Sequence, residues 1–317
     1  MRLNGQSIWI TGAGGFSARY LAVYLRQLPV ALELVGLERF HFENSNFDQV
    51  HKIDITNPEA MRRLARSRPP DCVFHLAGAM PPAEEGELWR VNVGGTQILL
   101  QTLAAAGTKP VRIVTIGSAA EYYPVRRNLI ETDKCGGETP YGRTKWAQTA
   151  IALACARELG MDVMVARTFN LLGPGLSNAL VAGSLCAQFA GDGPIKVGNT
   201  SASRDFVDVR DAVRAYWQIS QKGKRGEIYN VATGRATTIK KLLALFVKFA
   251  GNSRTIDESP TASRIADYAR VCGNNAKLRR LGWSPSISLE QSVRDMLASE
   301  NSQKLDHKTT DNRTCRR

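Results

Sequence analysis

The segment IWITGAGGFSA at residues 8–18 is the strongest indication of the fold. A run typical of a buried strand enters a glycine-rich turn, and an amphipathic helical pattern follows it. Gly12 permits a tight strand-to-helix turn, Gly15 lets the backbone approach a ligand, and the small Ala18 lets the helix pack on the strand. The first turn of such a helix offers free N–H groups. The spacing predicts a pyrophosphate-binding loop, with an ordinary glycine turn as the alternative.

Outward from this loop, apolar β-branched runs alternate with helical patterns through the first two thirds of the chain. Strands are predicted at Ser7–Thr11, Leu32–Leu37, Cys72–Leu76, Val111–Ile116 and Val163–Thr168. Helices are predicted at Phe16–Leu28, Pro58–Arg66, Leu88–Ala106 and Tyr141–Leu159. Continuous apolar strands joined by helices imply an α/β fold in which a parallel sheet is covered on both faces.

After Gly173 the pattern changes, because Pro, Gly and Asn break the chain into shorter pieces. We therefore expect residues 1–172 to form the main domain and residues 173–300 to form mainly a smaller substrate-binding lobe. One or two strands of this second part are expected to return to the main sheet. Residues 301–317 form a polar, basic tail and are predicted to be disordered.

The end of the second predicted strand bears on cofactor choice. An acid at this position accepts hydrogen bonds from a free ribose 2′-hydroxyl, whereas an Arg pairs with a 2′-phosphate. The sequence offers both Glu38 and Arg39, so NADH and NADPH both remain open. Asp54 follows a third short strand, where it could contact the adenine or serve as a turn or cap residue.

A proton-transfer group is predicted from Tyr141 and Lys145, which fall one helical turn apart on the same helix face. A free phenol has a pKa of about 10, and a nearby ammonium stabilises the phenolate. Ser118 ends the predicted strand before this helix, and ligands bind beyond the carboxyl ends of parallel strands. The three side chains are therefore expected to meet at one site.

These residues resemble motifs of the extended short-chain dehydrogenase/reductase family. The segments that carry the resemblance are T-G-x-x-G-F at 11–16, His-Leu-Ala-Gly at 75–78, Asn-Val-Gly-Gly-Thr at 92–96, Arg-Thr-Phe-Asn at 167–170 and Arg-Asp-Phe-Val-Asp-Val-Arg-Asp at 204–211. The resemblance extends from about residue 6 to residue 299. Within the family, this sequence is most similar to the branch that acts on nucleotide-sugars. Within it, the GDP-4-keto-6-deoxy-mannose reductases are the nearest subgroup, with GDP-mannose 4,6-dehydratases as relatives.

The resemblance implies a Rossmann-type doubly wound parallel sheet with a smaller C-terminal α/β lobe, and reduction of the C4 ketone of a nucleotide-activated 4-keto-6-deoxy sugar. It implies Ser118, Tyr141 and Lys145 as catalytic residues. It implies that NADPH or NADH contacts Gly12, Gly14, Gly15, Phe16, Ser17, Glu38, Arg39, Asp54, Ile55, Leu76, Ala77, Gly78, Asn92, Tyr141 and Lys145. It implies that a nucleotide-diphosphate sugar, a GDP-sugar by preference, contacts Ser118, Asn170, Arg204 and Arg264.

Three other polar residues are expected to have structural rather than catalytic roles. Asp205 and Asp208 are expected to be local structural partners, and His75, which ends a strand, is expected to be a packing residue rather than a base. For Arg204 and Arg264 the alternative to a diphosphate contact is a surface salt bridge.

One departure from the family pattern concerns dehydration. Dehydratases of this family place an acid/base pair directly after the Ser or Thr, and here Ala119 and Ala120 occupy those positions. A methyl group cannot move the protons that dehydration requires, so a reductase is favoured unless Glu121 supplies the missing group. Two alternatives stay open: a nucleotide-sugar 4-epimerase with the same three catalytic side chains, and a non-catalytic dinucleotide-binding protein. The second would be expected to have lost the Tyr or the Lys.

The chain has 317 residues, with 42 Lys and Arg against 29 Asp and Glu, giving a formal charge of +13. The excess is scattered, some of it over 62–68 and 277–280, with no stripe of interleaved basic and aromatic residues. Solvated helix faces explain it best, a field that steers a doubly charged substrate comes second, and nucleic-acid binding is not expected.

The composition, with 43% hydrophobic residues, is that of a globular protein. The spacing of the six cysteines fits reduced thiols, and neither disulfides nor a metal site are expected. No apolar run of about 18 residues predicts a membrane span, so a cytoplasmic protein is expected. The family resemblance suggests a homodimer formed by the helices at 88–106 and from 141. Their residues Leu99, Leu100, Leu103, Ala152 and Ala156 could face a partner subunit or the subunit's own sheet.

Overall fold

The computed structural model describes residues 5–42, 44–107, 110–251, 254–258 and 269–314, with side chains as far as residue 302. Its largest unit is a seven-stranded parallel sheet with the order β10-β6-β5-β4-β1-β2-β3. The strands are β1 (Gln6–Thr11), β2 (Leu32–Glu38), β3 (Gln49–Lys52), β4 (Cys72–His75), β5 (Arg112–Ser118), β6 (Asp162–Thr168) and β10 (Ile228–Val231). The predicted doubly wound parallel sheet is confirmed.

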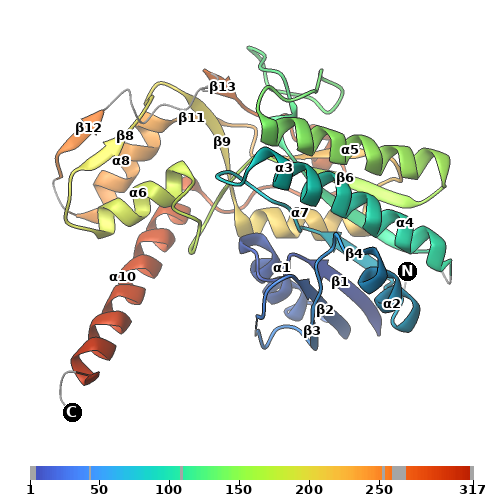
Figure 1. Ribbon diagram of the computed structural model, residues 1–317. Coiled ribbons are helices and arrows are strands. Elements are labelled where there is room, and N and C mark those ends of the chain that lie inside the picture. Colours follow the sequence, from blue (N-terminus) through green and yellow to red (C-terminus); the bar gives the residue numbers. More distant parts are fainter. Residues whose placement is uncertain (1–4, 43, 108–109, 252–253, 259–268, 315–317) are drawn as a thin grey trace.

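Helices cover both faces of this sheet (Figure 1). One face carries α1 (Phe16–Arg26) and α7 (Val209–Lys222); the other carries α2 (Pro58–Ser67), α4 (Thr96–Ala106) and α5 (Pro140–Glu158). The alternation of side chains along a strand produces the two cores. In β1, Ile8 and Ile10 join the core under α1 and α7, whereas Trp9 joins the core under α2, α4 and α5.

The single helix predicted over 88–106 is interrupted by a wider turn. α3 (Glu85–Leu88) leads into the π-helical segment η1 (Trp89–Gly95), which continues as α4. The Thr96 hydroxyl donates to the Asn92 carbonyl at 2.7 Å and so competes for an acceptor of the helix backbone. Single π turns within helices are frequent at functional sites, and this one contains Asn92.

The second part of the chain builds a smaller α/β lobe. β9 (Ser203–Asp208) pairs with β7 (Asn170–Leu172), β11 (Ala236–Thr238) and β13 (Arg270–Val271), and β8 (Ile195–Val197) pairs with β12 (Ile256–Glu258). The helices here are α6 (Val181–Ala190), α8 (Ile239–Ala250) and α10 (Leu289–Thr314), whereas Leu278 of α9 (Ala276–Arg279) packs in the core of the main sheet. α6, α8 and α10 enclose a separate apolar core that includes Phe189, Phe246 and Val293. β10 and α7 return to the main sheet, so both parts of the chain build the larger unit.

α10 differs from the prediction for the tail. Residues 301–317 were expected to be disordered, but the helix continues to Thr314 (Figure 1). The segment 301–314 contains neither Gly nor Pro, so nothing in it interrupts the helical hydrogen bonds. Across the described residues, no helix combines the length and apolar character needed to cross a membrane.

Candidate active site

The glycine turn lies where the strand order reverses, since β1 stands between β2 and β4. Gly12 has φ +66°, and a Cβ atom there would lie 2.8 Å from the Cα atom of Ala77. The N–H groups of Gly12 and Ala13 donate to the Leu37 carbonyl at 2.8 and 3.2 Å. α1 begins after Gly15 without a side-chain cap, so donors of its first turn remain for an anion. This donor set fits the pyrophosphate of a dinucleotide.

Glu38, at the end of β2, adjoins this turn. Its carboxylate accepts the Gly14 N–H at 2.9 Å and the Arg39 N–H at 2.8 Å. The Arg39 guanidinium instead pairs with Glu87 of α3 at 2.9 Å and lies 4.6 Å above the Phe40 ring. Of the two candidate ribose-binding residues, the acid therefore contacts the glycine turn directly and the Arg is held by α3.

Asp54 forms a local turn. One of its oxygens accepts the N–H and the hydroxyl of Thr56 at 2.9 and 2.8 Å, and the other pairs with Arg90 at 3.3 Å. Of the two roles left open for Asp54, the structure shows the turn. The neighbouring Ile55 is buried against Gly95 of η1. Contact of either residue with a cofactor stays a prediction.

His75 ends β4 in a buried chain of hydrogen bonds. The Thr96 hydroxyl donates to a carbonyl, so it accepts from His75 Nε2–H at 2.8 Å. The Thr11 hydroxyl accepts the Ala77 N–H at 3.1 Å and donates to His75 Nδ1 at 2.8 Å. The ring is therefore neutral, and burial lowers its pKa to about 3. The prediction of a packing residue rather than a base fits this geometry.

Asn92 continues the hydrogen bonds toward α5. Its side-chain oxygen accepts the Ala79 N–H at 2.7 Å, and its amide nitrogen donates to the Ala79 carbonyl at 3.1 Å and to the Thr144 hydroxyl at 3.0 Å. Thr144 donates in turn to the Tyr141 carbonyl at 2.9 Å. The glycine at position 78 leaves room for this amide, because a Cβ atom there would lie only 3.0 Å from Asn92 Oδ1. The loop after β4 and the start of α5 are thus tied together.

α5 presents the predicted proton-transfer pair on one face. Its N-cap Thr139 accepts the Gly142 N–H at 3.0 Å, and Pro140 occupies the first helical position. The partly exposed Tyr141 lies beside the Ser118 side chain, so the structure brings these two residues together. Burial of the phenol raises the pKa of Tyr141 to about 12, and the neighbouring Ser118 hydroxyl acts in the opposite direction.

The Lys145 ammonium, predicted to stabilise the phenolate, donates its hydrogen bonds to other acceptors. Its Nζ atom donates to the Ile116 carbonyl at 2.6 Å and to the Gln148 side chain. Burial of the ammonium lowers the pKa of Lys145 to about 8. With the ammonium held by these two acceptors, burial dominates the pKa of Tyr141.

Glu121 is unavailable for dehydration. It closes the short 3₁₀ helix η2 (Ala119–Glu121), where it accepts the Ser118 N–H at 2.7 Å and pairs with Arg167 at 2.8 Å, both side chains being buried. Arg167 has no role predicted from the sequence, although a charged residue in the apolar strand at 163–168 is a signal for a buried partner. The positions that dehydratases need are therefore held by Ala119 and Ala120 alone.

The predicted substrate residues begin beside Ser118. Thr168 pairs with Ser118 in the main sheet, and Asn170 opens β7 two residues later. The Asn170 amide donates to the Asp205 carbonyl at 3.4 Å on the adjacent strand β9, which also carries the half-buried Arg204. The structure thus gathers Asn170 and Arg204 on one sheet. Arg264 lies outside the described residues.

The two acids near Arg204 fit the structural roles predicted for them. Asp205 accepts hydrogen bonds from Thr233 and Gly234, and Asp208 caps α7 by accepting the Arg210 N–H at 2.9 Å. Both are buried. Neither therefore presents a free carboxylate to a substrate.

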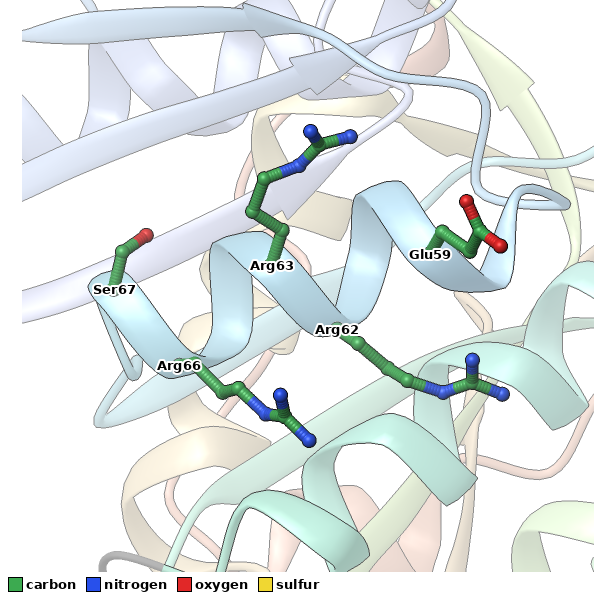
Figure 2. Close-up of a pocket in the computed structure, with 5 residues that line it drawn as sticks. All are labelled: Glu59, Arg62, Arg63, Arg66 and Ser67. Carbon is green, nitrogen blue, oxygen red and sulfur yellow. The ribbon is translucent and has the colours of Figure 1, made fainter.

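The arginines of α2 line a shallow hollow on the surface together with Glu59 and Ser67 (Figure 2). Arg62 and Arg66 point to one side of the helix and Arg63 to the other. Because these side chains point in different directions, they fit solvated faces of the helix better than a single basic surface.

The apolar residues that left the dimer question open face the subunit's own sheet. They share one buried core with strands β1, β2, β5 and β6. These residues are Leu99, Leu100, Leu103, Ala152 and Ala156. Any contact between subunits through α4 and α5 must use the opposite faces of these helices.

Comparison with known proteins shows which family this chain resembles. Residues 8–232 match the NAD dependent epimerase/dehydratase family. GDP-6-deoxy-D-mannose reductase of Pseudomonas aeruginosa is 30% identical over 310 residues, which span 92% of this chain and 96% of that protein.

Two solved structures share the whole fold. RMD from Pseudomonas aeruginosa complexed with NADPH superposes with a TM-score of 0.82 at 30% identity, covering 94% of this chain and 99% of that one. A putative epimerase from Burkholderia cenocepacia superposes with a TM-score of 0.86 at 29% identity, covering 95% and 99%.

Proposed function

The chain belongs to the NAD-dependent epimerase/dehydratase family, and on this premise we propose that it reduces the C4 ketone of a nucleotide-activated 4-keto-6-deoxy sugar with NADPH or NADH. A GDP-sugar is favoured by the similarity to GDP-6-deoxy-D-mannose reductase. The observation that carries the proposal is the proximity of the Tyr141 phenol and the Ser118 side chain at a site where Ala119 and Ala120 replace a dehydration pair.

The side chains at this site are proposed to transfer a proton. When bound, NAD(P)H supplies the hydride that a ketone needs for reduction. The raised pKa of Tyr141 keeps its phenol protonated at neutral pH, so it is ready to donate a proton to the C4 oxygen as negative charge develops there. Ser118 donates a second hydrogen bond to that oxygen and fixes its position. Lys145 holds a positive charge below pH 8, which stabilises the phenolate that Tyr141 leaves behind.

The groups proposed to hold the substrate lie on the smaller lobe. Arg204 and Arg264 are proposed to pair with the diphosphate, since a guanidinium matches phosphate oxygens in charge and geometry. Asn170, which lies next to the Ser118 end of β5, is proposed to contact the nucleotide-sugar. The net charge of +13 attracts such a dianion from a distance.

A 4-epimerase uses the same three side chains, and the similarity to a putative epimerase keeps this second candidate. The deciding experiment mixes the purified protein with NADPH or NADH and a GDP-, UDP- or dTDP-4-keto-6-deoxy sugar. Reduction predicts stoichiometric loss of absorbance at 340 nm and a 4-hydroxy product. Tightly copurifying NAD⁺, interconversion of 4-epimers and no net cofactor oxidation would instead identify an epimerase. No turnover of the 4-keto sugars would contradict the reductase, and no interconversion of GDP-, UDP- or dTDP-sugars that carry a C4 hydroxyl, tested with NAD⁺, would contradict the epimerase.

A homodimer is proposed through the outward faces of α4 and α5. Trp146 on α5 is 43% exposed and Trp89 of η1 is 39% exposed, which is unusual for large apolar side chains. Trp146→Glu would introduce a charge into such an interface. Light scattering should then show the mass fall from two subunits to one, and an unchanged dimer would place the interface elsewhere.

A further inference from the structure

A buried ion pair lies next to Ser118, at the end of β5. The Glu121 and Arg167 side chains are 0% and 2% exposed, and Glu121 Oε2 lies 2.8 Å from two guanidinium nitrogens. Taking two charges out of water is costly, and replacing such a pair with apolar residues of similar size is often neutral or stabilising. Fold stability alone therefore gives a weak reason for this pair.

The second carboxylate oxygen of Glu121 reaches the catalytic serine. Oε1 accepts the Ser118 N–H at 2.7 Å, while Ser118 Oγ accepts the Ala120 N–H at 3.2 Å, so the two residues cap each other. The preceding residue is Gly117, where a Cβ atom would lie 2.6 Å from Oε1. The end of β5 is thus shaped to admit this carboxylate.

The backbone of Glu121 reaches the tyrosine helix. Its carbonyl accepts the N–H groups of Gly136 and Gly137 at 2.9 and 3.1 Å. Gly137 packs against the backbone of Gly142 in the first turn of α5, so closely that a Cβ atom would overlap it. Glu121 therefore contacts both the residue that carries the serine hydroxyl and the segment that supports Tyr141.

Arg167 is held in place by contacts with residues other than Glu121. Its guanidinium stacks 4.5 Å above the Tyr122 ring and donates to the Glu131 carbonyl at 3.4 Å. The Tyr122 hydroxyl donates to Asn230 Oδ1 at 2.7 Å, which anchors the cluster to β10. The carboxylate consequently has one fixed position.

We propose that Glu121, held by Arg167, is a positioning residue that fixes Ser118 against Tyr141 and whose charge acts on the groups that hold the transferred proton. This inference rests on the proposed function and refines it. Glu121 touches no reacting atom and acts through Ser118, Tyr141 and Lys145.

The charge effect has a definite sign. The groups that face the carboxylate are Arg167 on β6, Tyr141 and Lys145 on α5, and Cys135 on the loop after η2. A negative charge disfavours phenolate and favours ammonium, so Glu121 raises the pKa of both Tyr141 and Lys145. Removing it should lower both, and the alkaline limb of the pH profile should move to lower pH.

The test compares two double variants that both lack the buried charges. Glu121→Gln with Arg167→Met keeps an oxygen that can accept the Ser118 N–H, whereas Glu121→Leu with Arg167→Met has none. We expect similar melting temperatures and similar KM for NADPH, but a kcat about tenfold to a hundredfold lower for the Leu variant, because misplaced catalytic groups cost rates of this order. Equal kcat values for the two variants would overturn the positioning role.

A single variant covers the case in which the double variants do not fold. Gly117→Ala leaves the ion pair intact but directs a methyl group at Glu121 Oε1, so kcat should fall while NADPH binding persists. Wild-type kcat and pH profile in this variant would equally overturn the proposal.

Titration without substrate separates this inference from the proposed function. Phenolate absorbance at 295 nm, taken as the difference from Tyr141→Phe in the same background, should show a lower Tyr141 pKa once Glu121 is replaced by Gln. An unchanged Tyr141 pKa contradicts the charge effect, whether or not any sugar is turned over. Absence of turnover by the unaltered protein counts against the proposed function instead.

Discussion

The two sheets of this protein handle their polar residues differently. Along the carboxyl edge of the main sheet, Thr11, His75, Thr96 and Asn92 are buried and hydrogen-bonded to one another. In the smaller sheet, Arg204 lies half-buried on a strand whose partners are only two or three residues long. On the proposed function, proton transfer is supported by a hydrogen-bonded network within the protein, whereas Arg204 on the smaller sheet is proposed to contact the substrate.

The largest expected effect tests the main sheet. Tyr141→Phe removes the proposed proton donor, so kcat should fall about a hundredfold or more, the lower end of what such groups contribute. The dissociation constant for NADPH, measured by fluorescence, should stay within about twofold, because no charge or backbone donor is lost. Tyr24→Phe on α1, at the opposite face of the sheet, is the control and should retain activity. Turnover unaffected by the Tyr141 change would end the assignment of this site.

The next effect tests the smaller sheet. Arg204→Ala should raise KM for the nucleotide-sugar about tenfold to a hundredfold, the value of a hydrogen bond to a charged group, while kcat at saturation changes little. Arg63→Ala on α2 is the matched control and should leave both constants unchanged (Figure 2). A fall in kcat without a rise in KM would contradict this division of substrate recognition and chemistry between the two sheets.

The pH dependence gives a smaller effect on the main sheet. Burial lowers the pKa of Lys145 to about 8, so the ammonium prevails below that pH and the neutral amine above it. kcat/KM should therefore decline above pH 8, by about tenfold per further pH unit. Lys145→Arg keeps its charge throughout, and this limb should vanish from the activity that remains. A flat profile to pH 10 in the unaltered enzyme would contradict the role of Lys145.

The smallest effect concerns cofactor choice. Glu38 contacts the glycine turn, and its charge opposes a 2′-phosphate placed beside it. Glu38→Ser should raise the ratio of kcat/KM for NADPH to that for NADH by about fivefold, since charges near the surface are partly screened. Asp71→Ser, at the amino end of β4, is a control that should leave this ratio unchanged. An unaltered ratio in the Glu38 variant would remove this residue from the ribose site.

Much of the site could be predicted because its signals are local. Gly12 must be glycine for steric reasons, and Tyr141 and Lys145 share a face because they are four residues apart on a helix. The missing dehydration pair was likewise visible as two alanines after Ser118. Helical periodicity could not say whether Leu99 and its neighbours face a partner or the sheet, since both environments are apolar.

The sequence alone sufficed to predict the parallel sheet, the glycine turn and the side chains proposed for catalysis, because each depends on spacing within one strand or helix. Only the tertiary structure decided that Glu121 binds Arg167, which is 46 residues away, and that the Lys145 ammonium rests on the Ile116 carbonyl. Such pairings depend on which strands become neighbours and on where burial makes an unpaired charge too costly. Those are properties of the assembled fold and of no single segment.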